Sequence, residues 1–99
     1  MRLSPDQIRT IAQAVTEFAG AQASVRLFGS RVDDSARGGD VDLLVETPEP
    51  VDRPAVLAAS IAARIERAFG GRKVDVLLSA PNLQQLPIHQ IARSTGRLL

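Results

Sequence analysis

The sequence predicts a single α+β domain, a small β-sheet with helices packed on it. Two observations lead to this fold class. The chain has 99 residues, a length at which one hydrophobic core rarely divides into two domains. Along it the apolar residues recur with the period of a helix in some segments and of a strand in others. The resulting order is helix, strand, strand, helix, strand, helix, which is typical of a sheet covered by helices.

The first helix is predicted over residues 5–19. Ser4 suits the N-cap, Pro5 the first turn and Gln7 the position that completes a capping box. Gly20 supplies the stop signal. The apolar positions that follow at helical spacing are Ile8, Ile11, Ala12, Val15, Phe18 and Ala19.

Two strands separated by a loop follow the first helix. Residues 24–28 read as a short strand, with Val25 and Leu27 on one face. Residues 31–39 are polar and contain a Gly-Gly pair, so we expect a loop there. Residues 40–46, with the sequence DVDLLVE, form the second predicted strand.

The second half of the chain repeats the alternation. After a proline-rich linker, residues 55–69 carry apolar side chains at helical spacing, and the glycines that follow stop the helix. Residues 73–78 read as the third strand, and residues 87–94 as a short helix ended by Gly96. Residues 97–99 are long enough for one more short strand.

The composition excludes several classes of function. The chain has no cysteine, which rules out disulfide scaffolds, thiol catalysis and cysteine-ligated zinc, and which fits a cytoplasmic protein. Its 12 basic and 11 acidic residues give a formal charge of +1, so no basic field attracts a phosphate backbone. We therefore expect no direct nucleic-acid binding. No apolar run approaches the roughly 18 residues of a membrane span, so we expect no membrane partner either.

Two residue types have simple structural interpretations. The single histidine, His89, has no second nitrogen ligand beside it, so we expect a satisfied or surface group rather than a zinc ligand. The phenylalanines Phe18, Phe28 and Phe69 are most simply core residues.

Three aspartates interrupt the predicted strands. Asp40 and Asp42 are two residues apart and therefore share one face of the second strand, and Asp75 lies between two valines of the third. An isolated D-x-D more often faces water at a strand edge. Three carboxylates on neighbouring strands repel one another, however, and a hard divalent cation such as Mg²⁺ or Mn²⁺ resolves that conflict. The sequence thus indicates a metal site.

A turn suited to phosphate lies upstream of these acids. The first predicted strand runs directly into Gly29 and Ser30, followed by Arg31. Glycine allows close approach of the backbone, serine offers a hydroxyl and an amide, and arginine adds a positive charge. A lone Gly-Ser pair is a weak signal, but this order of turn, D-x-D and later V-D-V is far more specific.

The motifs resemble those of a known family. Residues 29–31 (GSR), 40–45 (DVDLLV) and 74–76 (VDV) are similar to minimal nucleotidyltransferases of the DNA polymerase β superfamily. Such minimal nucleotidyltransferases are of the MNT type, which is often paired with HEPN-domain toxins. The closing segments of this chain, residues 87–93 and 96–99, also resemble the usual ending of the family. The resemblance covers most of the chain and implies that residues 1–99 form one minimal domain. It implies the polymerase β-like nucleotidyltransferase fold with a small mixed β-sheet.

The resemblance also implies catalytic roles for the three acids. Asp40 and Asp42 would bind two Mg²⁺ or Mn²⁺ ions, one on the triphosphate and one shared with the attacking hydroxyl. Asp75 would ligate the second ion and help to deprotonate that hydroxyl. The ions would stabilise charge on the α-phosphate and on the leaving pyrophosphate.

The same resemblance places the nucleoside triphosphate on the upstream turn. Gly29 and Ser30 would hold the β- and γ-phosphates, and Arg31 would either touch phosphate or pair with an acid of the following loop. The gap between Ser30 and Asp40 is one residue shorter than the commonest family spacing.

Two interpretations of the function remain open. The first is an enzyme that moves a nucleoside monophosphate, most simply AMP from ATP, to a hydroxyl of a partner protein. In HEPN/MNT pairs the acceptor implied is a tyrosine of a small helical toxin, and the MNT chain is the antitoxin. The second is a protein-binding antitoxin whose metal and nucleotide site is vestigial. The intact acids and the Gly-Ser turn favour the enzyme.

Overall fold

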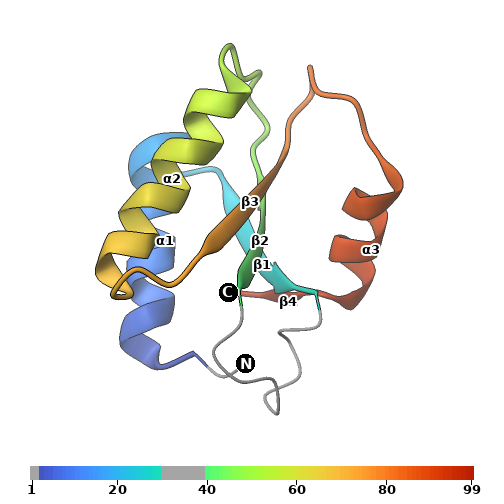
Figure 1. Ribbon diagram of the computed structural model, residues 1–99. Coiled ribbons are helices and arrows are strands. Elements are labelled where there is room, and N and C mark those ends of the chain that lie inside the picture. Colours follow the sequence, from blue (N-terminus) through green and yellow to red (C-terminus); the bar gives the residue numbers. More distant parts are fainter. Residues whose placement is uncertain (1–2, 30–39) are drawn as a thin grey trace.

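The chain folds as a mixed four-stranded sheet with helices on both faces (Figure 1). A computed structural model describes residues 3–29 and 40–99. Among these, every predicted element is present, with each end within one residue of its expected position. The α+β prediction is therefore confirmed. In chain order the elements are α1 (Pro5–Ala19), β1 (Ser24–Phe28), β2 (Val41–Glu46), α2 (Pro54–Ala68), β3 (Val74–Ser79), α3 (Pro87–Thr95) and β4 (Arg97–Leu98).

The sheet contains both kinds of strand pairing. Its order is β3-β2-β1-β4, with β2 parallel to β3, and with β1 antiparallel to β2 and to β4. Antiparallel neighbours can follow one another through a turn, whereas a parallel pair needs a crossover. Helix α2 supplies that crossover between β2 and β3. The mixed sheet expected from the family resemblance is confirmed.

Helices α1 and α2 cover one face of the sheet and contain most of the core (Figure 1). Alternate residues of β2 point into this layer, because side chains of a strand alternate between its faces. The fully buried side chains that fill the core include Ile11, Leu27, Val41, Leu43, Val45, Ile61 and Ile65.

The start of α1 follows the sequence prediction. Ser4 Oγ accepts a hydrogen bond from the backbone amide of Gln7 at 3.1 Å, and Gln7 Oε1 accepts from the amide of Ser4 at 2.9 Å. This reciprocal pair satisfies two amides that the first turn of a helix leaves unpaired. The expectation for Phe18 was wrong, because this side chain lies in the last turn of α1 and is exposed.

Helix α3 crosses the other face of the sheet, from β3 to β1. At its start, the buried His89 accepts a hydrogen bond from the Leu86 amide at Nδ1 and donates from Nε2 to the Leu78 carbonyl of β3, both at 2.9 Å. At its end, Gly96 lies against β1, where an added Cβ would be 3.2 Å from the Cβ of Phe28. Both histidine nitrogens are thus satisfied, as expected.

A small second core lies beneath α3. Phe28 of β1, Leu44 of β2 and Ala92 of α3 are buried together, with Leu77 of β3 packed against them. Because α3 covers only the middle of this face, it separates the two ends of the β2–β3 pair from each other.

In the part of the chain that the structure describes, no helix is long and apolar enough to cross a membrane.

Candidate functional site

Two of the predicted acids occupy paired positions on neighbouring strands. Asp42 of β2 is the register partner of Asp75 in the parallel strand β3, and such strands lie about 4.8 Å apart. Their side chains share the face that α3 partly covers, because Val41 and Leu43 point into the opposite layer. Asp42 is half-buried, whereas the Asp75 side chain is 52% exposed. This end of the sheet therefore carries two adjacent carboxylates.

Gly29 lies directly against one of these carboxylates. It follows β1 with a φ of +84°, in the left-handed region that only glycine adopts readily. A Cβ at this position would lie 2.6 Å from Oδ2 of Asp42, which is closer than non-bonded atoms approach. The neighbouring Phe28 is the register partner of Asp42. The turn and the acid predicted to act together are thus in contact in the fold.

Replacing Gly29 by alanine is expected to destabilise the protein more than replacing Gly71. Gly71 has a similar φ of +91° but no atom within 4 Å of an added Cβ, so it isolates the backbone cost, about 1–2 kcal/mol. Gly29→Ala adds a clash with Asp42, for which about 1–3 kcal/mol more is expected. Urea unfolding of the two variants measures the difference. Equal losses of stability would show that the contact with Asp42 has no energetic consequence.

The third acid is not grouped with the other two. Asp40 is half-buried and immediately precedes β2, whose first amide, that of Val41, donates to the Lys73 carbonyl at 3.0 Å. Among residues 3–29 and 40–99, no three His, Cys, Asp or Glu side chains form a group that could hold a metal ion. Carboxylate oxygens are the ligands that Mg²⁺ and Mn²⁺ prefer. The three aspartates therefore offer the right kind of donor atom for such an ion, although they do not surround a common point.

One basic residue lies beside the exposed acid. The Nζ of Lys73 is 4.0 Å from Oδ1 of Asp75, and both side chains are more than half exposed. A solvent-exposed pair of this length contributes little to stability. Asp75 is therefore accessible from solvent near the start of β3, where it forms a weak ion pair with Lys73. The predicted phosphate-binding residues Ser30 and Arg31, and the loop over 31–39, lie outside the residues that the structure describes.

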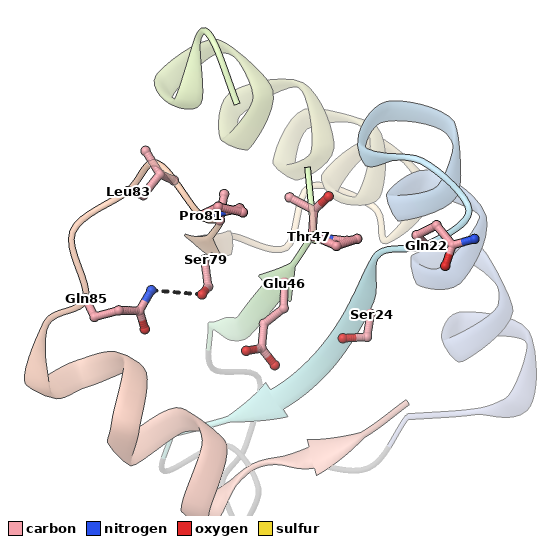
Figure 2. A pocket seen from close by; sticks show the side chains of 10 residues that line it. Gln22, Ser24, Glu46, Thr47, Ser79, Pro81, Leu83 and Gln85 are labelled. Atoms are coloured by element: carbon pink, nitrogen blue, oxygen red, sulfur yellow. Dashed lines mark hydrogen bonds between the residues drawn. The ribbon is translucent and has the colours of Figure 1, made fainter. Parts of the chain in front are cut away.

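The opposite end of the same sheet face contains an open pocket of about 590 Å³ (Figure 2). It lies at the carboxyl ends of the parallel strands β2 and β3, on the far side of α3 from the aspartates. Its lining includes Ser24, Glu46, Thr47, Ser79, Leu83 and Gln85.

A hydrogen-bond network beside this cavity joins α3 to the sheet. Arg93 of α3 donates from Nε to Glu46 Oε2 at 2.7 Å, and from Nη2 to Ser79 Oγ at 2.9 Å and Gln85 Oε1 at 2.7 Å. Arg26 of β1 lies 3.6 Å from the other oxygen of Glu46. Sequence reasoning did not single out this network, since its partners are far apart along the chain. The only signal was a second acid, Glu46, at the end of the strand that also contains Asp42.

Comparisons with known proteins bear on the family and the fold. The sequence profile of the nucleotidyltransferase domain family matches residues 8–95. The chain is similar to a crystal structure of a mutant toxin–antitoxin MntA–HpeT, at 18% identity and a TM-score of 0.63, over 98% of this chain and 71% of that one. It is also similar to a crystal structure of a toxin–antitoxin with AMP-PNP, at 18% identity and a TM-score of 0.67, over 97% of this chain and 72% of that one.

These structural similarities confirm the expected nucleotidyltransferase fold. No curated protein sequence matches the chain.

Proposed function

This chain belongs to the nucleotidyltransferase domain family, and we propose that it transfers AMP from ATP to a hydroxyl of a partner protein. One observation carries the proposal. The glycine of the expected phosphate-binding turn lies against Asp42, and Asp42 is paired in register with Asp75. A strand-end turn and two adjacent acids are the parts that nucleotidyl transfer needs for a triphosphate and its cations.

Each residue of the site has a separate role in this proposal. Asp40, Asp42 and Asp75 would hold two Mg²⁺ ions, whose positive charge would stabilise the α-phosphate and the departing pyrophosphate. Gly29 would let the backbone approach the β- and γ-phosphates, and Ser30 and Arg31, which follow it in the sequence, are the residues expected to bind them. Asp75, the more exposed acid, lies where an incoming hydroxyl can reach it and accepts its proton.

We propose that the acceptor is a tyrosine of a small helical HEPN-type toxin, and that the chain is its antitoxin. The chain contains no tyrosine, so such an acceptor must come from another protein. Both similar solved structures are of toxin–antitoxin proteins, one of them with AMP-PNP, a non-hydrolysable analogue of ATP. The alternative is a binding antitoxin without activity. It is favoured by one observation, the absence of a closed three-acid group among residues 3–29 and 40–99.

The two functions are distinguished by the mass of the partner. The chain is co-expressed with the protein encoded beside it, and the intact mass of that protein is measured after purification. We expect an increase by one or more AMP groups, because Asp75 is exposed to solvent and a docked hydroxyl can reach it. Co-expression with Asp42→Asn is expected to give the unmodified mass. A neutralised toxin of unchanged mass in the wild-type complex would favour the binding antitoxin instead.

A further inference from the structure

The strand that contains Asp75 forms an edge of the sheet. Its one neighbour among the strands that the structure describes is β2 (Figure 1). In β2, Leu43 and Leu44 are fully buried. Their register partners in β3, Val76 and Leu77, are only half-buried. The middle of β3 is therefore partly open to solvent on its outer side.

The hydrogen bonds to β2 show which backbone groups of β3 face outward. The Val41 amide donates to the Lys73 carbonyl at 3.0 Å. The Thr47 amide donates to the Ser79 carbonyl at the same distance. In a parallel ladder, alternate residues of a strand bond to one neighbour, so the odd-numbered residues of β3 face β2. The even-numbered residues 74, 76 and 78 therefore direct their amides and carbonyls to the outer edge.

Side chains cap two of these outward groups. Glu66 of α2 accepts a hydrogen bond from the Val74 amide at Oε2, at 2.9 Å. His89 of α3 donates from Nε2 to the Leu78 carbonyl, also at 2.9 Å. Caps of this kind keep a long strand from pairing with an edge. Between them lie the amide and the carbonyl of Val76, so the edge offers a short stretch of backbone centred on this residue.

We propose that an extended segment of the acceptor protein pairs with the outer edge of β3 at Val76. Amides and carbonyls that face outward from an edge strand are matched by the backbone of an added strand. The proposal rests on the proposed function and adds to it the way in which the acceptor binds. The residue of the segment opposite Asp75 has its side chain on the same face of the sheet, with the two Cβ atoms roughly 5 Å apart. A hydroxyl at that position reaches the carboxylate that accepts its proton.

A second copy of this chain fits the edge less well. Symmetric dimers are the commonest assemblies of identical chains. Two β3 strands paired antiparallel about Val76 would place Leu77 of each copy opposite Asp75 of the other. This arrangement covers a carboxylate with an apolar side chain, which is costly. The segment that fits belongs to another protein and has a hydroxyl-bearing residue, rather than a leucine, opposite Asp75.

Val76→Pro tests the edge. Proline has no amide to donate, and its ring occupies space that an incoming strand needs, whereas the ladder to β2 keeps its bonds because this amide faces outward. Binding of the protein encoded beside this chain is expected to weaken roughly tenfold or more. Transfer of AMP to that protein is expected to fall in parallel when the protein is limiting.

Leu98→Pro is the matched control, because Leu98 lies in the other edge strand, β4. Its amide also faces outward, since the next amide along the chain, that of Leu99, donates to the Val25 carbonyl at 3.0 Å. Partner binding and AMP transfer by this variant are expected to equal those of the wild type. Calorimetry with MgATP is expected to give equal affinity for both variants and the wild type.

Amide hydrogen exchange of the wild type tests the proposal without a substitution. In the complex with the partner, the Val76 amide is expected to exchange roughly tenfold or more slowly than in the free chain. The Val74 amide, which already bonds to Glu66, is expected to change little. An unchanged rate at Val76, or equal partner binding by Val76→Pro and the wild type, would overturn the docking edge while AMP transfer, measured by mass, still stands. A wild-type dimer that Val76→Pro converts to a monomer would assign the edge to self-association and overturn the proposal also.

Discussion

The double substitution Asp40→Asn and Asp42→Asn is expected to abolish metal-dependent binding of ATP. Asparagine preserves the size of each side chain and removes its charge, so the change acts on cation binding rather than on packing. Two of the proposed metal ligands are lost together, and a triphosphate without its cations meets the remaining acid, Asp75, as a like charge. Titration calorimetry of the wild type and the double variant, each with and without Mg²⁺, measures the effect.

The control for this result is Asp52→Asn. Asp52 is an exposed acid in the linker that follows β2, beyond the carboxyl ends of β2 and β3 and therefore at the end of the sheet opposite to Asp42 and Asp75. Its removal changes the net charge in the same direction and is expected to leave ATP affinity unchanged. Thermal unfolding of all variants shows whether the fold is retained. Equal and metal-independent ATP affinity in the wild type and the double variant would contradict the assignment of Asp40 and Asp42 as metal ligands.

The placement of the two adjacent acids could be predicted from the sequence because it depends on local rules. In β2 the alternation of side chains fixes the face of Asp42, since Val41, Leu43 and Val45 must all be buried. Asp75 interrupts the only other run of valine and leucine of similar length. Both strands enter the sheet with the apolar side inward, so their acids share the other face.

The contact between Gly29 and Asp42 could be predicted only in part. The sequence indicates a turn at Gly29, because glycine tolerates the positive φ that the structure shows there. The antiparallel register of β1 and β2, which brings the turn onto the Asp42 carboxylate, depends on how the strands pair. Strand pairing between distant segments is set by the whole core rather than by either strand alone.

The role of α3 could not be predicted from local patterns. Its apolar residues Ile88 and Ile91 suggest a buried side, yet they are exposed and His89 is buried instead. The reason is that His89 completes two backbone hydrogen bonds and Arg93 reaches Glu46, which lies 47 residues earlier. These polar contacts orient the helix and leave the apolar side outward. Periodicity treats all apolar positions as buried and cannot detect such a rotation.

Asp75→Asn is expected to separate catalysis from nucleotide binding. In the proposed site Asp75 would help to hold one of the two ions and would accept the proton of the attacking hydroxyl, whereas the triphosphate would be held chiefly through Asp40 and Asp42. The variant is therefore expected to keep most of its affinity for MgATP. Loss of a base together with one metal ligand is expected to slow transfer at least ~10²-fold. Transfer of label from α-labelled ATP to the partner, followed over time, measures the rate.

The weak ion pair between Asp75 and Lys73 provides a control. It tests whether Asp75 acts in catalysis or has only a structural role in β3. If Asp75 acted only through its 4.0 Å contact with Lys73, then Lys73→Met would slow transfer as much as Asp75→Asn does. We expect instead that Lys73→Met changes the rate by no more than a few-fold, because an exposed pair of this length is worth little. Full transfer by Asp75→Asn would show that this acid is a structural residue of β3, and the proton of the hydroxyl would then have to leave by way of Asp40 or Asp42.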